Sequence, residues 1–267
     1  MVARGTQEYQ CDCDPCLGSG WSWSQSELDA ALTADVHSLV YDEVGRNACI
    51  DMLAAASTTG FDMSAVGEIF QTPSSVRNWE VGECIASAYI RDNRNCFVPW
   101  NTRRDVRNPQ SSLPGVDICG IQDCGGHSRL FFCEVKTSAE RRYPPQVASM
   151  SGEGLGAQVV ELRDDANVRH TVIQYLAHRA INASWKDRFS IAVRNYCSAR
   201  HTDFCVFGFM VRDVPPDKKD LNARVRTVAS GGAHCSAIEF IALYLPVGSI
   251  ASLGSRVEGV AGRRTTS

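Results

Sequence analysis

The fold is decided by one stretch near the middle of the chain, Pro114-Gly-Val-Asp-Ile-Cys-Gly-Ile121, which is followed by Arg129-Leu-Phe-Phe-Cys-Glu-Val-Lys136. The second segment has the composition of an apolar strand. Because strand side chains alternate between two faces, we expect Leu130, Phe132, Glu134 and Lys136 to share one face. Burying charge costs several kcal/mol unless the charge is paired or metal-bound. A carboxylate and an ammonium that end an apolar face therefore mark a candidate site.

The upstream segment places a second carboxylate nearby. Asp117 alternates in register with Cys119 and Ile121, so these three side chains should lie on one face of the preceding strand. The short connection from Asp123 to His127 contains Gly-Gly, which favours a tight hairpin turn. Pairing of the two strands then brings Asp117, Glu134 and Lys136 to one edge of a sheet.

Composition limits the class of protein. Of the 267 residues, 44% are hydrophobic and 21% are charged, as in soluble globular proteins. No apolar run reaches the ~18 residues of a membrane helix, and the first ten residues lack the apolar segment of a signal peptide. Many of the twelve cysteines lie in apolar runs, which indicates buried thiols in a reducing compartment. We expect a cytoplasmic protein with no membrane segment.

The formal net charge of −3 does not suit bulk electrostatic binding of nucleic acid. A nucleic-acid substrate would need a local basic patch or a partner protein. The arginines near the central motif either supply such a patch or are ordinary soluble surface; they are Arg103, Arg104, Arg107, Arg141 and Arg142.

The order of apolar patterns predicts a mixed α/β domain with a central sheet. We divide the chain into an N-terminal segment with a helical extension (1–75), a main domain (76–250) and a flexible tail (251–267). Helical periodicity is expected over 26–58, 63–70, 76–93, 155–162 and 168–181. Besides the two central segments, strands are expected over 96–100, 205–211 and 237–245.

Two further features of the chain have alternative interpretations. Cys11, Cys13 and Cys16 could begin a zinc site, although tetrahedral zinc takes four ligands; a flexible or docking segment is the other interpretation. Glu83 lies within an apolar stripe of the helix expected over 76–93. It is either a solvated glutamate at the edge of that stripe or a carboxylate directed at the site.

Two carboxylates and a lysine at a sheet edge suit metal-assisted hydrolysis of a phosphodiester. Mg²⁺ prefers oxygen ligands, which Asp117, Glu134 and the Val135 carbonyl could provide. A bound Mg²⁺ polarises a phosphate oxygen and acidifies a bound water, and Lys136 could orient that water or stabilise developing charge. The alternative is a surface salt bridge between Glu134 and Lys136, worth under ~1 kcal/mol.

These residues resemble the PD-(D/E)XK, or restriction-endonuclease-like, nucleases. The match consists of Gly115-Val-Asp117 and Glu134-Val-Lys136, with Glu83 in the preceding helix and the frequent proline displaced to Pro114. The resemblance implies an α-β-β-β-α-β core over about 76–211. It also implies a deoxyribonuclease that uses Mg²⁺, or Mn²⁺ in its place, with Asp117, Glu134, Lys136 and Glu83 as catalytic residues. Some members carry a glutamine in the following helix, for which Gln158 and Gln174 are candidates.

In size and spacing the chain is similar to the nuclease component of Hachiman-type antiphage systems, which work with a helicase partner. That similarity implies a role in antiviral defence, with DNA and a helicase as partners. A restriction enzyme or a repair nuclease would share the same core. A non-catalytic subunit could keep this fold for scaffolding, and a thiol enzyme lacks a recognisable Cys/His pair.

Overall fold

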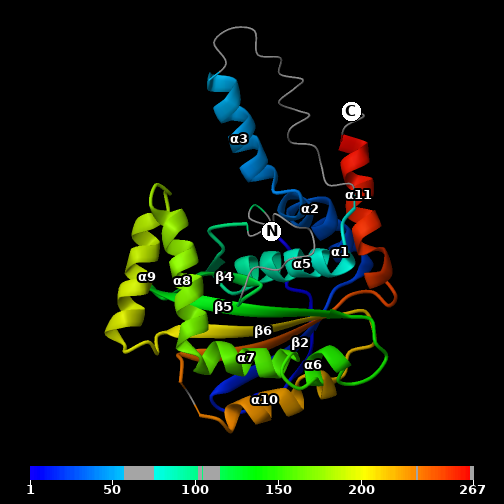
Figure 1. Ribbon diagram of the computed structural model, residues 1–267. Helices are drawn as coiled ribbons and strands as arrows, with labels where there is room; N and C mark the ends of the chain where they lie inside the picture. Colours follow the sequence, from blue (N-terminus) through cyan, green and yellow to red (C-terminus); the bar gives the residue numbers. More distant parts are fainter. Residues whose placement is uncertain (57–74, 102–103, 105–114, 233, 265–267) are drawn as a thin grey trace.

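A computed structural model describes residues 1–56, 75–101, 104, 115–232 and 234–264, with side chains through 53 and 260 in the first and last of these ranges. Seven strands form one sheet in the order β1-β2-β7-β6-β5-β4-β3 (Figure 1). The strands are β1 (Thr6–Gln10), β2 (Cys16–Ser22), β3 (Cys96–Phe97), β4 (Ile118–Cys124), β5 (His127–Ser138), β6 (Phe204–Arg212) and β7 (Ala237–Tyr244).

The sheet is mixed. Its centre, β2-β7-β6-β5, is parallel, whereas β1, β4 and β3 are antiparallel to their neighbours. Every residue of β6 is buried, as expected for a central parallel strand covered on both faces. The prediction of an α/β fold with a central mixed sheet is thus confirmed, and each expected strand is present. The first of them is shorter than predicted, since β3 ends at Phe97.

The N-terminal segment is part of this sheet, so the interpretation of it as a flexible segment is wrong, whereas a docking role stays a prediction. β1 and β2 form an antiparallel pair, and β2 runs parallel to β7 from Cys16 to Ser22. β2 contains glycines, which weaken the strand signal in the sequence but allow close packing in the structure. A Cβ on Gly18 would lie 2.7 Å from Val225, and one on Gly20 would lie 2.3 Å from the Tyr9 ring.

Helices cover both faces of the sheet (Figure 1). The face that carries Phe131, Cys133 and Val135 packs in one apolar core with α1, α2, α5 and α11. The face that carries Leu130 and Phe132 packs with α7 through α10. The bounds are α1 (Gln25–Thr33), α2 (Asp35–Val40), α3 (Glu43–Ala56), α5 (Asn78–Asn93), α6 (Gln146–Ser149), α7 (Leu155–Asp164), α8 (Ala166–Ala180), α9 (Lys186–Ser198), α10 (Asn222–Ala229) and α11 (Leu253–Arg264).

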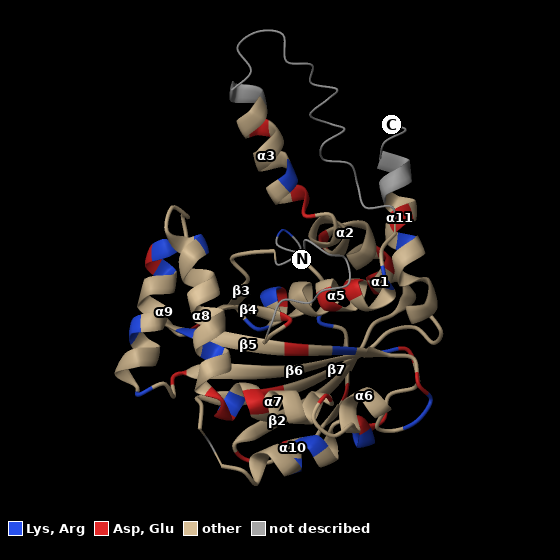
Figure 2. Cartoon of the chain, in the orientation of Figure 1, with Lys and Arg blue, Asp and Glu red and all other residues tan. Residues whose placement is uncertain are grey.

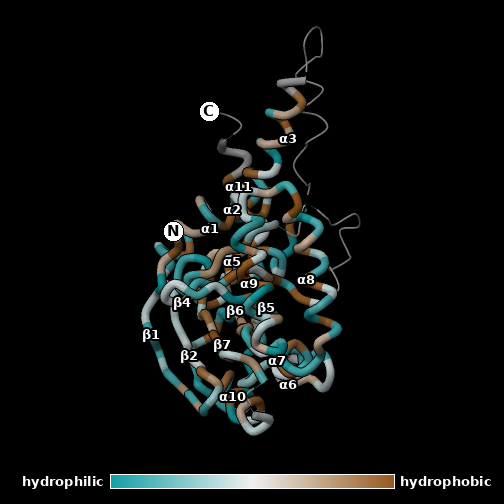
Figure 3. The backbone as a smooth tube through the Cα atoms, turned by 90° about the vertical axis from the view of Figure 1, so that its left-hand side faces the viewer, coloured by the Kyte–Doolittle hydropathy of each residue, from teal (hydrophilic) through white to brown (hydrophobic). Residues whose placement is uncertain are grey.

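Several helix predictions change in detail. The region expected to be helical from residue 26 is divided into α1, α2 and α3, and Ser24 caps α1 by accepting from the Glu27 N–H. α3 projects away from the sheet (Figure 1 and Figure 3). The predicted flexible tail instead forms a 3-10 turn, η3 (Ile250–Ser252), and α11. The helix expected over 63–70 lies outside the described residues.

The β4–β5 hairpin forms as predicted. Cys124 and His127 are its last pair, and Gly125 and Gly126 turn the chain with φ of +57° and +90°. Two successive positive φ angles are characteristic of tight hairpin turns and favour glycine. The hairpin therefore fixes the register that places Asp117 near Glu134. Among the described residues, no helix has the length and apolar character needed to cross a membrane.

Candidate active site at the β4–β5 edge

The β4–β5 register brings the predicted acidic residues together. Ile118 pairs with Cys133, so the next positions along the two strands are Asp117 and Glu134. The Asp117 Oδ2 atom accepts a 2.8 Å hydrogen bond from the Val135 N–H. The side chain of Asp117 thereby occupies the place that a backbone acceptor would have if the β4 ladder continued.

Lys136 completes a three-residue cluster. Its Nζ atom donates a 2.9 Å hydrogen bond to Glu134 Oε1, and Asp117 and Glu134 are joined by a side-chain hydrogen bond. The Glu134 side chain is 7% exposed and the Lys136 side chain 22% exposed. This pair is therefore not the surface salt bridge that was the alternative interpretation, and we call Asp117, Glu134 and Lys136 the acidic site.

Burial controls the electrostatics of the acidic site. The pKa of Glu134 is raised to about 7, chiefly by burial and then by the charge of Asp117, against the lowering effect of Lys136. Burial also raises the pKa of Asp117, although the hydrogen bond from Val135 and the charge of Lys136 act in the opposite direction. Buried Glu134 and half-buried Asp117 share one ammonium group. Full ionisation of both carboxylates therefore calls for a further cation, and otherwise a proton is retained.

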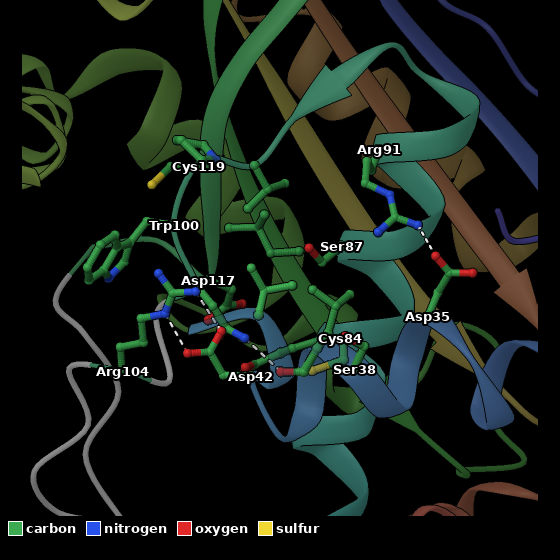
Figure 4. Close-up of a pocket in the computed structure, with 17 residues that line it drawn as sticks. Asp35, Ser38, Asp42, Cys84, Ser87, Arg91, Trp100, Arg104, Asp117 and Cys119 are labelled. Carbon is green, nitrogen blue, oxygen red and sulfur yellow. Dashed lines mark hydrogen bonds and ion pairs between the residues drawn. The ribbon is translucent and has the colours of Figure 1, made fainter. Parts of the chain in front are cut away.

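A pocket of about 280 Å³ opens beside Asp117 (Figure 4). Glu83 from α5 lines this pocket together with Asp117. Two ion pairs lie along its wall, Arg104 with Asp42 and Arg91 with Asp35. Glu83 thus shares a pocket with Asp117, whereas Glu134 and Lys136 are not among the residues that line it.

The described residues include no group of three or more His, Cys, Asp or Glu side chains that could hold a metal ion. Glu83 therefore does not form a three-carboxylate cluster with Asp117 and Glu134. Two carboxylates are nevertheless a sufficient protein contribution for Mg²⁺, which usually keeps several waters. The N–H and C=O of one strand residue point to the same side, so the Val135 carbonyl faces the side on which Asp117 lies. The carboxylate and carbonyl oxygens of these residues suit a hard divalent cation. The negative charge that Lys136 does not neutralise also favours such a cation.

The remaining predicted residues are distributed as follows. Gln158 lies half-buried on α7, and its Oε1 atom is buried without a hydrogen-bond partner. Gln174 is exposed on α8. Arg104 contacts Asp42 and lies over the Trp100 ring, Arg141 and Arg142 are exposed, and 103 and 107 lie outside the described residues.

The N-terminal cysteines are placed by the β1–β2 pair. Cys13 and Cys16 form a backbone bridge with N···O distances of 2.9 and 2.7 Å. Cys16 is fully buried in the core beneath α10. The described residues, which include Cys11, Cys13 and Cys16, contain no group of three side chains that could hold a metal ion. Cys16 is therefore a structural residue of the sheet, and Cys11 and Cys13 lie in the connection between β1 and β2.

One further charged residue of the sheet was missed. Arg212 ends β6 and is fully buried, where it pairs with Asp220. The signal that identified Glu134 was also present here, because an apolar run from Cys205 to Val211 ends in Arg-Asp. Strand alternation and the β5–β6 register place Arg212 beside Ser138, on the same face as Glu134 and Lys136.

Comparison with known proteins adds no relative. No protein-family model matches this chain, and no curated protein matches it either. The geometry of the acidic site is therefore the basis on which a function can be assigned.

Proposed function

We propose that this protein is a metal-dependent nuclease that hydrolyses DNA phosphodiester bonds at the acidic site. The observation that supports this most is the pairing of half-buried Asp117 with buried Glu134, which are hydrogen-bonded and only partly neutralised by Lys136. A structural ion pair between Glu134 and Lys136 would not require a second carboxylate beside it. A site that receives a divalent cation does require that excess of negative charge.

Asp117, Glu134 and the Val135 carbonyl would hold Mg²⁺, or Mn²⁺ in its place. When bound, the ion supplies polarisation of a phosphate oxygen and acidification of a water. The chain's own contribution is to hold these donors rigidly: the Val135 N–H fixes Asp117, and Lys136 fixes Glu134. The Lys136 ammonium also provides a positive charge for the transition state. Glu83 lines the same pocket as Asp117 and is retained as a candidate catalytic residue, but not as a ligand grouped with Asp117 and Glu134.

The test is cleavage of labelled single-stranded and duplex DNA with Mg²⁺, Mn²⁺ or EDTA. Asp117→Asn, Glu134→Gln and Lys136→Met should each lower the rate by at least about 100-fold. The matched control is Glu161→Gln, since Glu161 is an exposed glutamate of α7, and it should leave the rate unchanged. Circular dichroism spectra would confirm that all four variants fold. Wild-type rates in Glu134→Gln and Lys136→Met would exclude the assignment.

The biological setting that we propose is antiphage defence in the cytoplasm with a helicase partner. The acidic net charge of −3 supports a partner that delivers DNA. Phage plating on cells that carry wild-type or Lys136→Met protein, with and without a neighbouring helicase gene, tests this setting. Absence of DNA cleavage by the wild type, alone and with its partner, would instead favour a non-catalytic scaffolding subunit.

A further inference from the structure

A fully buried ion pair lies beyond the acidic site, at the carboxyl ends of the central strands. Arg212 Nε lies 3.2 Å from Asp220 Oδ2, and both side chains are fully buried. The Tyr244 hydroxyl donates to the same oxygen at 2.9 Å. Replacing a buried ion pair by apolar residues is often neutral or stabilising. Stability alone therefore does not explain this arrangement, which we call the clamp (Arg212, Asp220 and Tyr244).

The clamp connects two loops. Arg212 donates to the carbonyl of Ser138 at 3.0 Å and to that of Arg142 at 3.0 Å, so it holds the loop that follows β5. Asp220 belongs to η2 (Lys218–Asp220), in the segment that follows β6. A second tie joins the same two loops, because the Tyr143 hydroxyl donates to the Pro215 carbonyl at 2.7 Å.

Both loops carry exposed positive charge. Arg141 and Arg142 are exposed in the first loop, and Lys218 and Lys219 are exposed in the second. Figure 2 shows Lys and Arg beyond the end of β5 and near α6 and α10. Outside the clamp, these loops hold three acidic side chains: Glu140, which accepts from the Gln146 N–H, Asp217, which lies 3.8 Å from Lys219, and Asp213, which is buried and accepts from the Ile250 N–H. At the surface, four exposed cations therefore outnumber the two half-buried carboxylates, in a chain with a net charge of −3.

This basic surface continues directly from the acidic site. Glu134, Lys136 and Ser138 follow one another on the same face of β5, and Ser138 pairs with Arg212. At about 3.3 Å per residue, Ser138 lies ~13 Å beyond Glu134. Measured along the axis of a B-form duplex, that distance corresponds to about four base-pair steps of ~3.4 Å each.

We propose that the two clamped loops bind the sugar-phosphate backbone of a polynucleotide whose scissile bond lies at the acidic site. This inference rests on the proposed nuclease function and specifies its substrate class, a strand that extends at least about four nucleotides beyond the point of cleavage. Arg141, Arg142, Lys218 and Lys219 are phosphate-binding residues, and Arg212 and Asp220 are positioning residues. The net negative charge of the protein is compatible with this role because the cations are concentrated on one surface.

The test measures DNA binding separately from cleavage. In a Lys136→Met background with Ca²⁺, anisotropy of a labelled 30-base strand and of the 30-base-pair duplex gives the affinity between 50 and 300 mM KCl. Adding Arg141→Ala and Arg142→Ala should reduce the slope of log affinity against log salt by about 2, since each phosphate contact contributes about one. The control adds Lys186→Ala and Arg194→Ala, two exposed cations of α9, and should leave the slope unchanged.

The possible results distinguish the proposed DNA-binding surface from the proposed nuclease function. An unchanged slope in the Arg141/Arg142 variant, with folding verified by thermal melting, would overturn the basic surface even if the wild type cleaves DNA. A reduced slope together with a wild type that cleaves nothing would retain the surface and reject the nuclease. Polyglutamate that competes as well as unlabelled DNA would overturn the assignment to nucleic acid, because it would show a general preference for polyanions.

Discussion

Substitution of Glu134 by Gln removes a buried group whose titration should control how the stability of the metal-free protein depends on pH. The pKa of Glu134 is raised from 4.5 to about 7 in the folded protein, mainly by burial. Below pH 4.5 the folded and unfolded states both hold this proton. Between 4.5 and 7 the unfolded chain releases the proton while the folded protein retains it. Stability is therefore lost as pH rises through this interval, and it levels off above pH 7.

The magnitude follows from linkage. A difference of one between the folded and unfolded pKa values corresponds to about 1.4 kcal/mol. The interval from 4.5 to about 7 therefore corresponds to about 3 kcal/mol of unfolding free energy. Glu134 is almost completely buried, with 5% exposure, so solvent screening reduces this value little. Glu134→Gln cannot titrate, and it should gain about 3 kcal/mol relative to wild type between pH 4.5 and 8.

The assay is urea unfolding in EDTA, followed by tryptophan fluorescence, at half-unit steps across that pH range. Groups outside the acidic site titrate in both proteins, so the difference between wild type and variant reports the titration of Glu134 together with its interaction with Asp117. Glu161→Gln, on the exposed side of α7, should follow the wild-type profile throughout. A wild-type to Glu134→Gln difference that stays constant with pH would show that Glu134 has an ordinary pKa, and it would refute the account of the acidic site.

Three further predictions concern the frame around the site, and urea unfolding measures each. Arg212→Met leaves Asp220 buried without its cation and should cost about 3–5 kcal/mol; adding Asp220→Leu should recover most of that loss, whereas an additive double variant would argue against the ion pair. Gly208→Ala should cost about 1–3 kcal/mol, because its Cβ would lie 2.7 Å from the Phe240 ring, and an unchanged midpoint would mean that the packing is looser than described. Ser24→Ala removes the cap of α1 and should cost about 1 kcal/mol, with Ser24→Asp as the variant that preserves stability.

The parts of the fold that could be predicted depend on short-range signals. The β4–β5 hairpin combines alternating apolar residues with a Gly-Gly turn, and its register alone places Asp117 beside Glu134. A charged end on an apolar strand then indicates the site. α9 was missed although Phe189, Ala192 and Tyr196 repeat at helical spacing and are buried, so a signal for it was available.

Other features depend on contacts that no local pattern reveals. β2 contains Gly18 and Gly20, which lower its strand propensity, and its partner β7 lies at the other end of the chain. The pairing of Arg212 with Asp220 and the shared pocket of Glu83 and Asp117 depend on how loops and helices meet. The sequence could therefore predict the hairpin that holds the acidic site. It could not predict the clamp or the pocket that α5 lines beside Asp117.

The pairing of β2 with β7 has a consequence for how the protein is made. Ser22 pairs with Tyr244, 222 residues later, so β2 leaves the ribosome long before its partner exists. At 5–20 residues per second, the interval is about 10–40 s. The β4–β5 hairpin needs only neighbouring residues and can form well within that time. The hairpin that carries the acidic residues is thus available early, whereas the sheet behind it can be completed only when synthesis of the chain is nearly finished.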